Sequence, residues 1–80
     1  MECAQGTVVK SLKGHDSGKL FVVMKSEKDF VFLTDGKTRK KHNPKKKNLK
    51  HIEITQTRIP EFESLSDKKI RKQLNLLREK

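Results

Sequence analysis

The stretch LFVVMKSEKDFVFLT, residues 20–34, decides the fold of this chain. It holds two runs rich in valine, phenylalanine and leucine, residues 20–24 and 30–34, around the polar residues 26–29. Runs of this length are too short for independent helices, and their residue types favour strands. We therefore predict that the two runs pair as an antiparallel hairpin with a turn at residues 26–29.

Strands are also predicted on both sides of this hairpin. Residues 7–11 are a short β-branched run, and residues 51–55 alternate polar and apolar side chains. Directly after the hairpin, Asp35-Gly36 predicts a type I′ turn, with residues 37–41 as the returning strand and residues 45–47 as a solvated loop. Five short strands with tight connections predict a mostly β fold, a small five-stranded barrel.

The phenylalanines are assigned first to the core. Phe21 is predicted to fill the barrel. Phe30 and Phe32 alternate with Val31 and Leu33, so one face of their strand should fill the barrel and the other should lie under a C-terminal helix. Stacking of these rings on nucleic-acid bases is the alternative.

The C-terminal part of the chain has a helical pattern. Ser66 is a suitable N-cap, with Ser64 as an alternative, and Asp67 is favourable in the first turn. One apolar stripe recurs at i, i+4 and i+7: Ile70, Leu74 and Leu77. A helix this short is marginal alone, so the stripe must pack on the barrel or on a partner. We expect one domain with three parts: a barrel at 1–57, a linker at 58–65 and a basic amphipathic helix at 66–80.

Composition limits the class of protein. The 80 residues carry a formal net charge of +10 and are only 31% hydrophobic, which leaves little apolar material for a deep substrate pocket. Cys3 is the only cysteine, so we expect neither a disulfide nor a thiolate metal cluster. We recognise no secretory leader and no apolar run that could cross a bilayer, so we expect a cytoplasmic protein with no membrane partner.

Basic residues are concentrated in one acid-free window, since no Asp or Glu lies between Gly36 and Ile52. Such a segment can engage successive phosphates and release their counterions. Lysine acts as a point charge, whereas arginine makes bidentate contacts to base edges, so the dominance of lysine favours recognition of the backbone over sequence. The alternatives are a charged surface that serves solubility and a membrane-binding surface, although no amphipathic anchor adjoins the window.

The sequence lacks recognisable motifs for catalysis or nucleotide binding. The segment from Gly14 to Lys19 superficially resembles a P-loop, but three residues rather than four separate its glycines and Leu20 follows the lysine. The histidines and Cys3 do not have the spacing of zinc ligands. We therefore expect no enzyme activity, no cofactor and no metal site.

Gly6-Thr7-Val8-Val9, the loop Gly14-His15-Asp16-Ser17-Gly18-Lys19 and the apolar run 20–24 together resemble a KOW motif. With the lysine-rich segment that follows, the chain is similar to small KOW-domain RNA-binding proteins related to large-subunit ribosomal proteins. The resemblance implies an SH3-like barrel that contacts RNA through this loop and the neighbouring basic hairpin. It also implies that Gly14 and Gly18 shape the loop, that Asp16 accepts hydrogen bonds from loop amides, and that Lys13 and Lys19 flank it.

We therefore expect a protein that binds structured RNA, with ribosomal RNA or the large ribosomal subunit as partner, in a structural or assembly role. The expected RNA contacts are the basic side chains of the loop and of the window: Lys13, His15, Lys19, Lys37, Arg39, Lys40, Lys41, Lys45, Lys46, Lys47 and Lys50. The alternative is a non-ribosomal transcription or RNA-chaperone adaptor, with the stripe of Ile70, Leu74 and Leu77 as its protein-binding surface. The free chain is expected to be a monomer.

Overall fold

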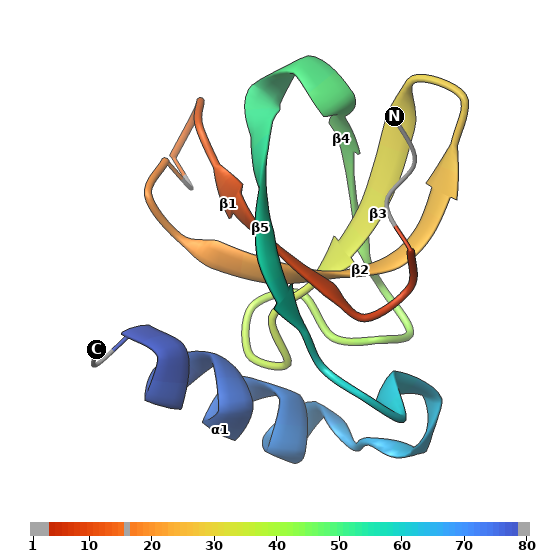
Figure 1. Cartoon of the computed structure of the whole chain (residues 1–80), viewed down its shortest axis with the longest axis vertical. Coiled ribbons are helices and arrows are strands. Elements are labelled where there is room, and N and C mark those ends of the chain that lie inside the picture. Colours follow the sequence, from red (N-terminus) through yellow and green to blue (C-terminus); the bar gives the residue numbers. More distant parts are fainter. Residues whose placement is uncertain (1–3, 16, 79–80) are drawn as a thin grey trace.

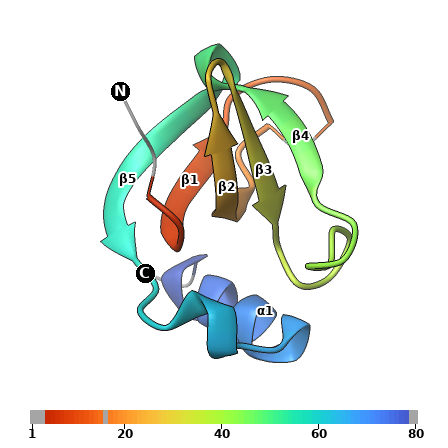
Figure 2. The same ribbon diagram turned by 90° about the vertical axis from the view of Figure 1, so that its right-hand side faces the viewer.

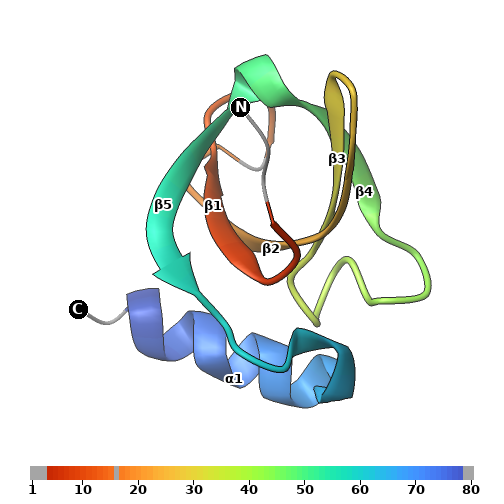
Figure 3. The ribbon, with the colours of Figure 1, turned by 45° about the vertical axis from the view of Figure 1, so that its right-hand side comes forward.

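The computed structural model describes residues 4–15 and 17–78, and in this part of the chain five strands precede one α-helix. The elements are β1 (Thr7–Ser11), β2 (Leu20–Glu27), β3 (Phe30–Thr34), β4 (Lys45–Asn48), the 3-10 turn η1 (Leu49–His51), β5 (Ile52–Arg58), the 3-10 turn η2 (Phe62–Ser64) and α1 (Asp67–Arg78). The strands form one antiparallel sheet in the order β4-β3-β2-β1-β5, which curls into a small barrel (Figures 1 and 3). The predicted fold class is confirmed.

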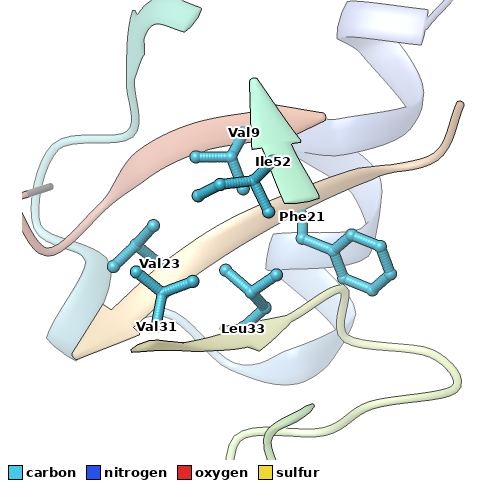
Figure 4. Close-up of a cluster of buried hydrophobic side chains, with 6 residues drawn as sticks. All are labelled: Val9, Phe21, Val23, Val31, Leu33 and Ile52. Atoms are coloured by element: carbon cyan, nitrogen blue, oxygen red, sulfur yellow. The ribbon is translucent and has the colours of Figure 1, made fainter. Parts of the chain in front are cut away.

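The inside of the barrel is filled by one side of the curled sheet. The buried side chains come from four strands and are Val9, Phe21, Val23, Val31, Leu33 and Ile52 (Figure 4). Phe21 therefore belongs to the core, as predicted. Because neighbouring residues of a strand point to opposite faces, Val8 and Val22 point outward, where they also need to be covered.

Helix α1 covers these outward valines. Ile70 and Leu74, with exposed fractions of 0% and 3%, pack in a second cluster with Val8, Val22 and Phe62. Figure 2 shows α1 lying across one end of the barrel. Each buried aliphatic side chain contributes about 1.5–3 kcal/mol, which stabilises a helix too short to persist alone. The helix thus packs on its own barrel.

The helix begins where the sequence predicts. The hydroxyl of Ser66 accepts a hydrogen bond from the amide of Lys69 at 3.3 Å, as an N-cap does. Asp67 lies in the first turn, where its charge interacts favourably with the helix dipole. Ser64 is part of η2 and is not the cap.

The connection after β3 differs from the prediction. Residues 37–41 are not a strand, and the lysines at 45–47 are not a loop, because they belong to β4 and pair with β3. Instead of a two-residue turn, the carboxylate of Asp35 accepts hydrogen bonds from the amides of Lys37 (2.9 Å) and Arg39 (2.8 Å) and folds a long loop. Gly36 packs so closely on the first turn of α1 that an added Cβ would lie 2.1 Å from the Asp67 carbonyl oxygen.

The prediction that the helix covers Phe30 or Phe32 is also wrong. Val31 and Leu33 fill the barrel, as one half of that prediction required. The helix, however, packs on the outer faces of β1 and β2 and leaves the outer face of β3 uncovered by α1. The alternation of β3 is therefore predictable from the sequence, but the helix lies on different strands.

Candidate nucleic-acid interface

The loop of residues 12–19, here called the glycine loop, connects β1 and β2. It is closed by two hydrogen bonds, from the Ser11 amide to the Lys19 carbonyl (2.9 Å) and from the Gly18 amide to the Ser11 carbonyl (2.8 Å). Gly14 and Gly18 have φ values of 85° and 88°, which glycine adopts without strain. Both glycines therefore hold positions of the loop that a residue with a Cβ would strain, whereas Asp16 lies outside the described residues.

The side chains of the glycine loop that were predicted to contact RNA lie on the surface. Lys13, His15 and Lys19 are all exposed. The loop is anchored to the C-terminal end of the acid-free window, because the amide of Leu12 donates a hydrogen bond to the carbonyl of His51 at 2.8 Å. This bond holds η1, and with it the exposed Lys50, beside the loop.

Strand β4 joins the same surface. The ammonium of Lys47 donates a hydrogen bond to the carbonyl of Lys13 at 2.7 Å, and it would lie 3.9 Å from a Cβ added to Gly14. Two segments more than thirty residues apart in the sequence therefore form one continuous basic surface, here called the basic face. It consists of the glycine loop, β4 and η1.

The alternation of β4 divides its three lysines between two sides of the edge strand. Lys45 and Lys47 pair with the core residues Leu33 and Val31 and so lie on the inner side. Lys46 lies on the outer side, where its ammonium is 4.4 Å from the centre of the Phe30 ring.

Lys47 is electrostatically distinct. Partial burial lowers the pKa of Lys47 below its usual value of 10.5, and repulsion by neighbouring Lys45 lowers it further. Both effects disfavour the charged ammonium in the free protein. The same ammonium donates to the Lys13 carbonyl, so Lys47 links β4 to the glycine loop.

Two predicted contacts, Lys37 and Lys40, are exposed in the loop between β3 and β4, while Arg39 is partly buried there.

Lys41 of the same loop has a different environment. Its ammonium donates to the carbonyls of Glu63 (3.2 Å) and Leu65 (3.0 Å), and lies 5.1 Å from the centre of the Phe62 ring. Lys41 therefore holds the segment before α1 and does not belong to the basic face.

The expected RNA contacts include no basic residue of the helix, although the sequence predicts that the helix is basic. Arg71 and Lys19 line a hollow of about 290 Å³, here called the basic groove; its other lining residues are Leu20, Asp35, Lys37, Leu74 and Asn75. The three cations come from the glycine loop, the β3–β4 loop and α1. Lys68 and Arg71 also line an adjoining hollow with Lys37 and Lys40. Arg71 directly follows Ile70 of the apolar stripe, so its position at the edge of the helix–barrel contact is predictable. The loop that this edge of the helix faces is not predictable from the sequence.

Two further findings concern residues 4–15 and 17–78, the part of the chain that the structure describes. In this part of the chain no three His, Cys, Asp or Glu side chains are grouped closely enough to hold a metal ion, and Cys3 lies outside it. No helix in the described ranges is both long and apolar enough to span a membrane.

Comparison of the chain with models of protein families and with curated proteins found no match. The resemblance to KOW proteins therefore stays a prediction from the sequence, based on residues 6–9, 14–24 and the lysine-rich segment.

Proposed function

We propose that this protein binds structured RNA through the phosphate backbone, with the basic face as its contact surface. We further propose a structural or assembly role on or near the large ribosomal subunit in the cytoplasm, and a binding rather than a catalytic activity. The observation that carries the proposal is the bond between Lys47 and Lys13, which joins the glycine loop to β4.

The chemistry of this face favours phosphates over base edges. Its cations are lysines, and lysine interacts with phosphate as a point charge. No acidic residue interrupts the chain from Gly36 to Ile52, so β4 and η1 themselves carry no carboxylate side chain. Each phosphate neutralised releases counterions, so affinity for RNA should fall steeply with salt and depend little on sequence.

The test is a double charge reversal on the basic face, Lys13→Glu with Lys50→Glu. Affinity for a large-subunit ribosomal RNA fragment is measured by fluorescence anisotropy over a series of KCl concentrations. The variant should bind more weakly and with a shallower dependence of log K on log salt. The matched control is Lys69→Glu with Lys72→Glu on exposed positions of α1, which has the same net charge. Equal losses in both variants would show that net charge, and not this face, determines binding.

The ribosomal part of the proposal has its own test. Cell extract is sedimented on a sucrose gradient at low salt and again after a high-salt wash. Co-migration with the large subunit through the wash would support an integral role. Migration at the top of the gradient even at low salt would favour the adaptor alternative. That alternative uses Ile70 and Leu74 as a protein-binding surface, whereas both side chains pack on the barrel.

A further inference from the structure

We propose that the outer face of β3 and β4, together with Met24 and Lys25 of β2, binds an unpaired nucleobase of single-stranded RNA. This face, here called the aromatic platform, consists of Met24, Lys25, Phe30, Phe32, Pro44 and Lys46. The proposal rests on the proposed function and adds a second kind of contact to it: stacking on a base beside the binding of phosphates.

The platform is set by the alternation of β3. Val31 and Leu33 are fully buried inside the barrel, so Phe30 and Phe32 point the other way. Phe30 is 37% exposed and Phe32 is half-buried. Figure 3 shows β3 and β4 side by side, away from β5, with α1 below β2 at one end of the barrel. Two aromatic side chains are thus left without the cover that the helix gives to β1 and β2.

A hollow of suitable chemistry lies beside Phe32. It has a volume of about 350 Å³ and is lined by Met24, Lys25, Phe32 and Pro44. A bulge between Val23 and Lys25 shifts the register of β2 and sets Lys25 opposite Phe32. The lining therefore combines an aromatic residue, a methionine and a proline with one lysine.

The charges around the platform favour a nucleotide over an apolar peptide. The ammonium of Lys46 lies 4.4 Å from the centre of the Phe30 ring, and Lys25 is 68% exposed although it pairs with Glu27 at 3.2 Å. An apolar partner would remove both ammonium groups from water without replacing their hydration. A stacked base instead brings a phosphate within reach of these lysines.

The test compares two RNAs. One is a single-stranded oligoadenylate that carries 2-aminopurine, and the other is a fully paired duplex of the same length. Stacking on an aromatic side chain is worth about 1–3 kcal/mol per base, so Phe32→Leu should weaken single-strand binding about 5- to 150-fold. Duplex affinity should not change, because paired bases are not available to the ring. Phe32→Tyr should keep single-strand affinity, and Leu76→Ala on the exposed face of α1 is the control for loss of an exposed apolar side chain.

Ring-selective NMR gives a second readout. The chain has four phenylalanines, of which Phe21 and Phe62 are buried. On addition of the oligoadenylate, ring resonances of Phe30 and Phe32 should move while those of Phe21 and Phe62 stay in place. Equal losses of duplex and single-strand affinity in Phe32→Leu, or no loss of either, would overturn the platform. A wild-type protein that binds neither RNA would instead refute the proposed function and the platform with it.

Discussion

Gly18 and Gly36 share a positive φ but differ in their surroundings. At Gly18, where φ is 88°, an added Cβ would meet nothing within 4 Å. At Gly36, where φ is 74°, it would lie 2.1 Å from the Asp67 carbonyl oxygen and 2.9 Å from the Arg71 amide nitrogen. The first glycine is needed for backbone conformation alone, and the second also for the close approach of α1.

We therefore predict different costs for alanine at the two positions. Gly18→Ala should lower the free energy of unfolding by about 1–2 kcal/mol, the strain of a left-handed residue. Gly36→Ala should lower the free energy of unfolding by about 2–5 kcal/mol in total, because overpacking against α1 costs about 1–3 kcal/mol in addition to the same strain. Urea unfolding of both variants measures the difference, and equal costs would mean that the loop and the helix do not meet as described.

The lowered pKa of Lys47 predicts that the free energy of unfolding depends on pH. Since burial and Lys45 lower the pKa of Lys47 in the folded state, the unfolded chain binds more protons between that lowered pKa and 10.5. The free energy of unfolding should therefore gain a contribution that rises with pH across this window. Lys47→Met should remove the rise, which urea unfolding at a series of alkaline pH values would show. A difference between wild type and variant that does not change with pH would contradict the lowered pKa.

Lys41 is predicted to act on stability and not on binding. Its ammonium is held by carbonyl oxygens of the segment before α1, so Lys41→Met should cost about 1–2 kcal/mol of unfolding free energy. At temperatures where the variant is folded, its affinity for RNA should match that of the wild type. Lys40→Met is the neighbouring exposed control, with a stability change within about 0.5 kcal/mol. Loss of RNA affinity in the Lys41 variant would return this lysine to the contact surface.

At the scale of elements, local patterns were predictable and contacts between distant segments were not. The hairpin of β2 and β3 follows from short apolar runs around polar residues, although β2 continues to Glu27 and the predicted turn at 26–29 shrinks to residues 28–29. The N-cap at Ser66 follows from its own neighbourhood. Strand β4 could not be predicted. Its sequence KKKN is polar throughout, and its strand geometry comes from pairing with β3.

The same reasoning explains the error at Asp35-Gly36. This dipeptide is compatible with a type I′ turn and also with a longer loop whose amides the carboxylate binds. The second outcome occurs here because Gly36 packs on α1, more than thirty residues later in the sequence. A local signal cannot report such a contact.

Docking of α1 leads to a prediction about two neighbouring leucines. Leu74 is 3% exposed in the cluster beneath the helix, and Leu76 is 55% exposed on the opposite side. Leu74→Ala should lower the free energy of unfolding by about 2–4 kcal/mol. Leu76→Ala should change it by less than about 0.5 kcal/mol. Thermal or urea unfolding of both variants tests whether the stripe belongs to the core in solution, and a small effect at Leu74 would reopen its role as a partner surface.

At the scale of the whole molecule, the position of the positive charge matters more for the proposed binding than the total charge does. The sequence located the acid-free window and the glycine loop, but only the fold brings them together through Lys47 and Lys13. It also adds Arg71 from α1 to a groove with Lys19 and Lys37. The candidate interface was thus predictable as a set of lysines but not as elements, since β4 was expected to be a loop. Its extension onto the helix depends on how α1 packs.

The basic groove predicts that equal changes in net charge have unequal effects. If RNA follows the groove, Lys37→Gln with Arg71→Gln should remove two phosphate contacts and reduce the slope of log K against log salt by about 1.4–1.8. Lys69→Gln with Lys72→Gln removes the same charge from exposed positions of α1 that do not line the groove, and should leave the slope nearly unchanged. Salt-dependent anisotropy titrations of both variants with one structured RNA would measure this difference. Identical slopes would mean that the RNA path ends at the glycine loop and β4 and does not reach the helix.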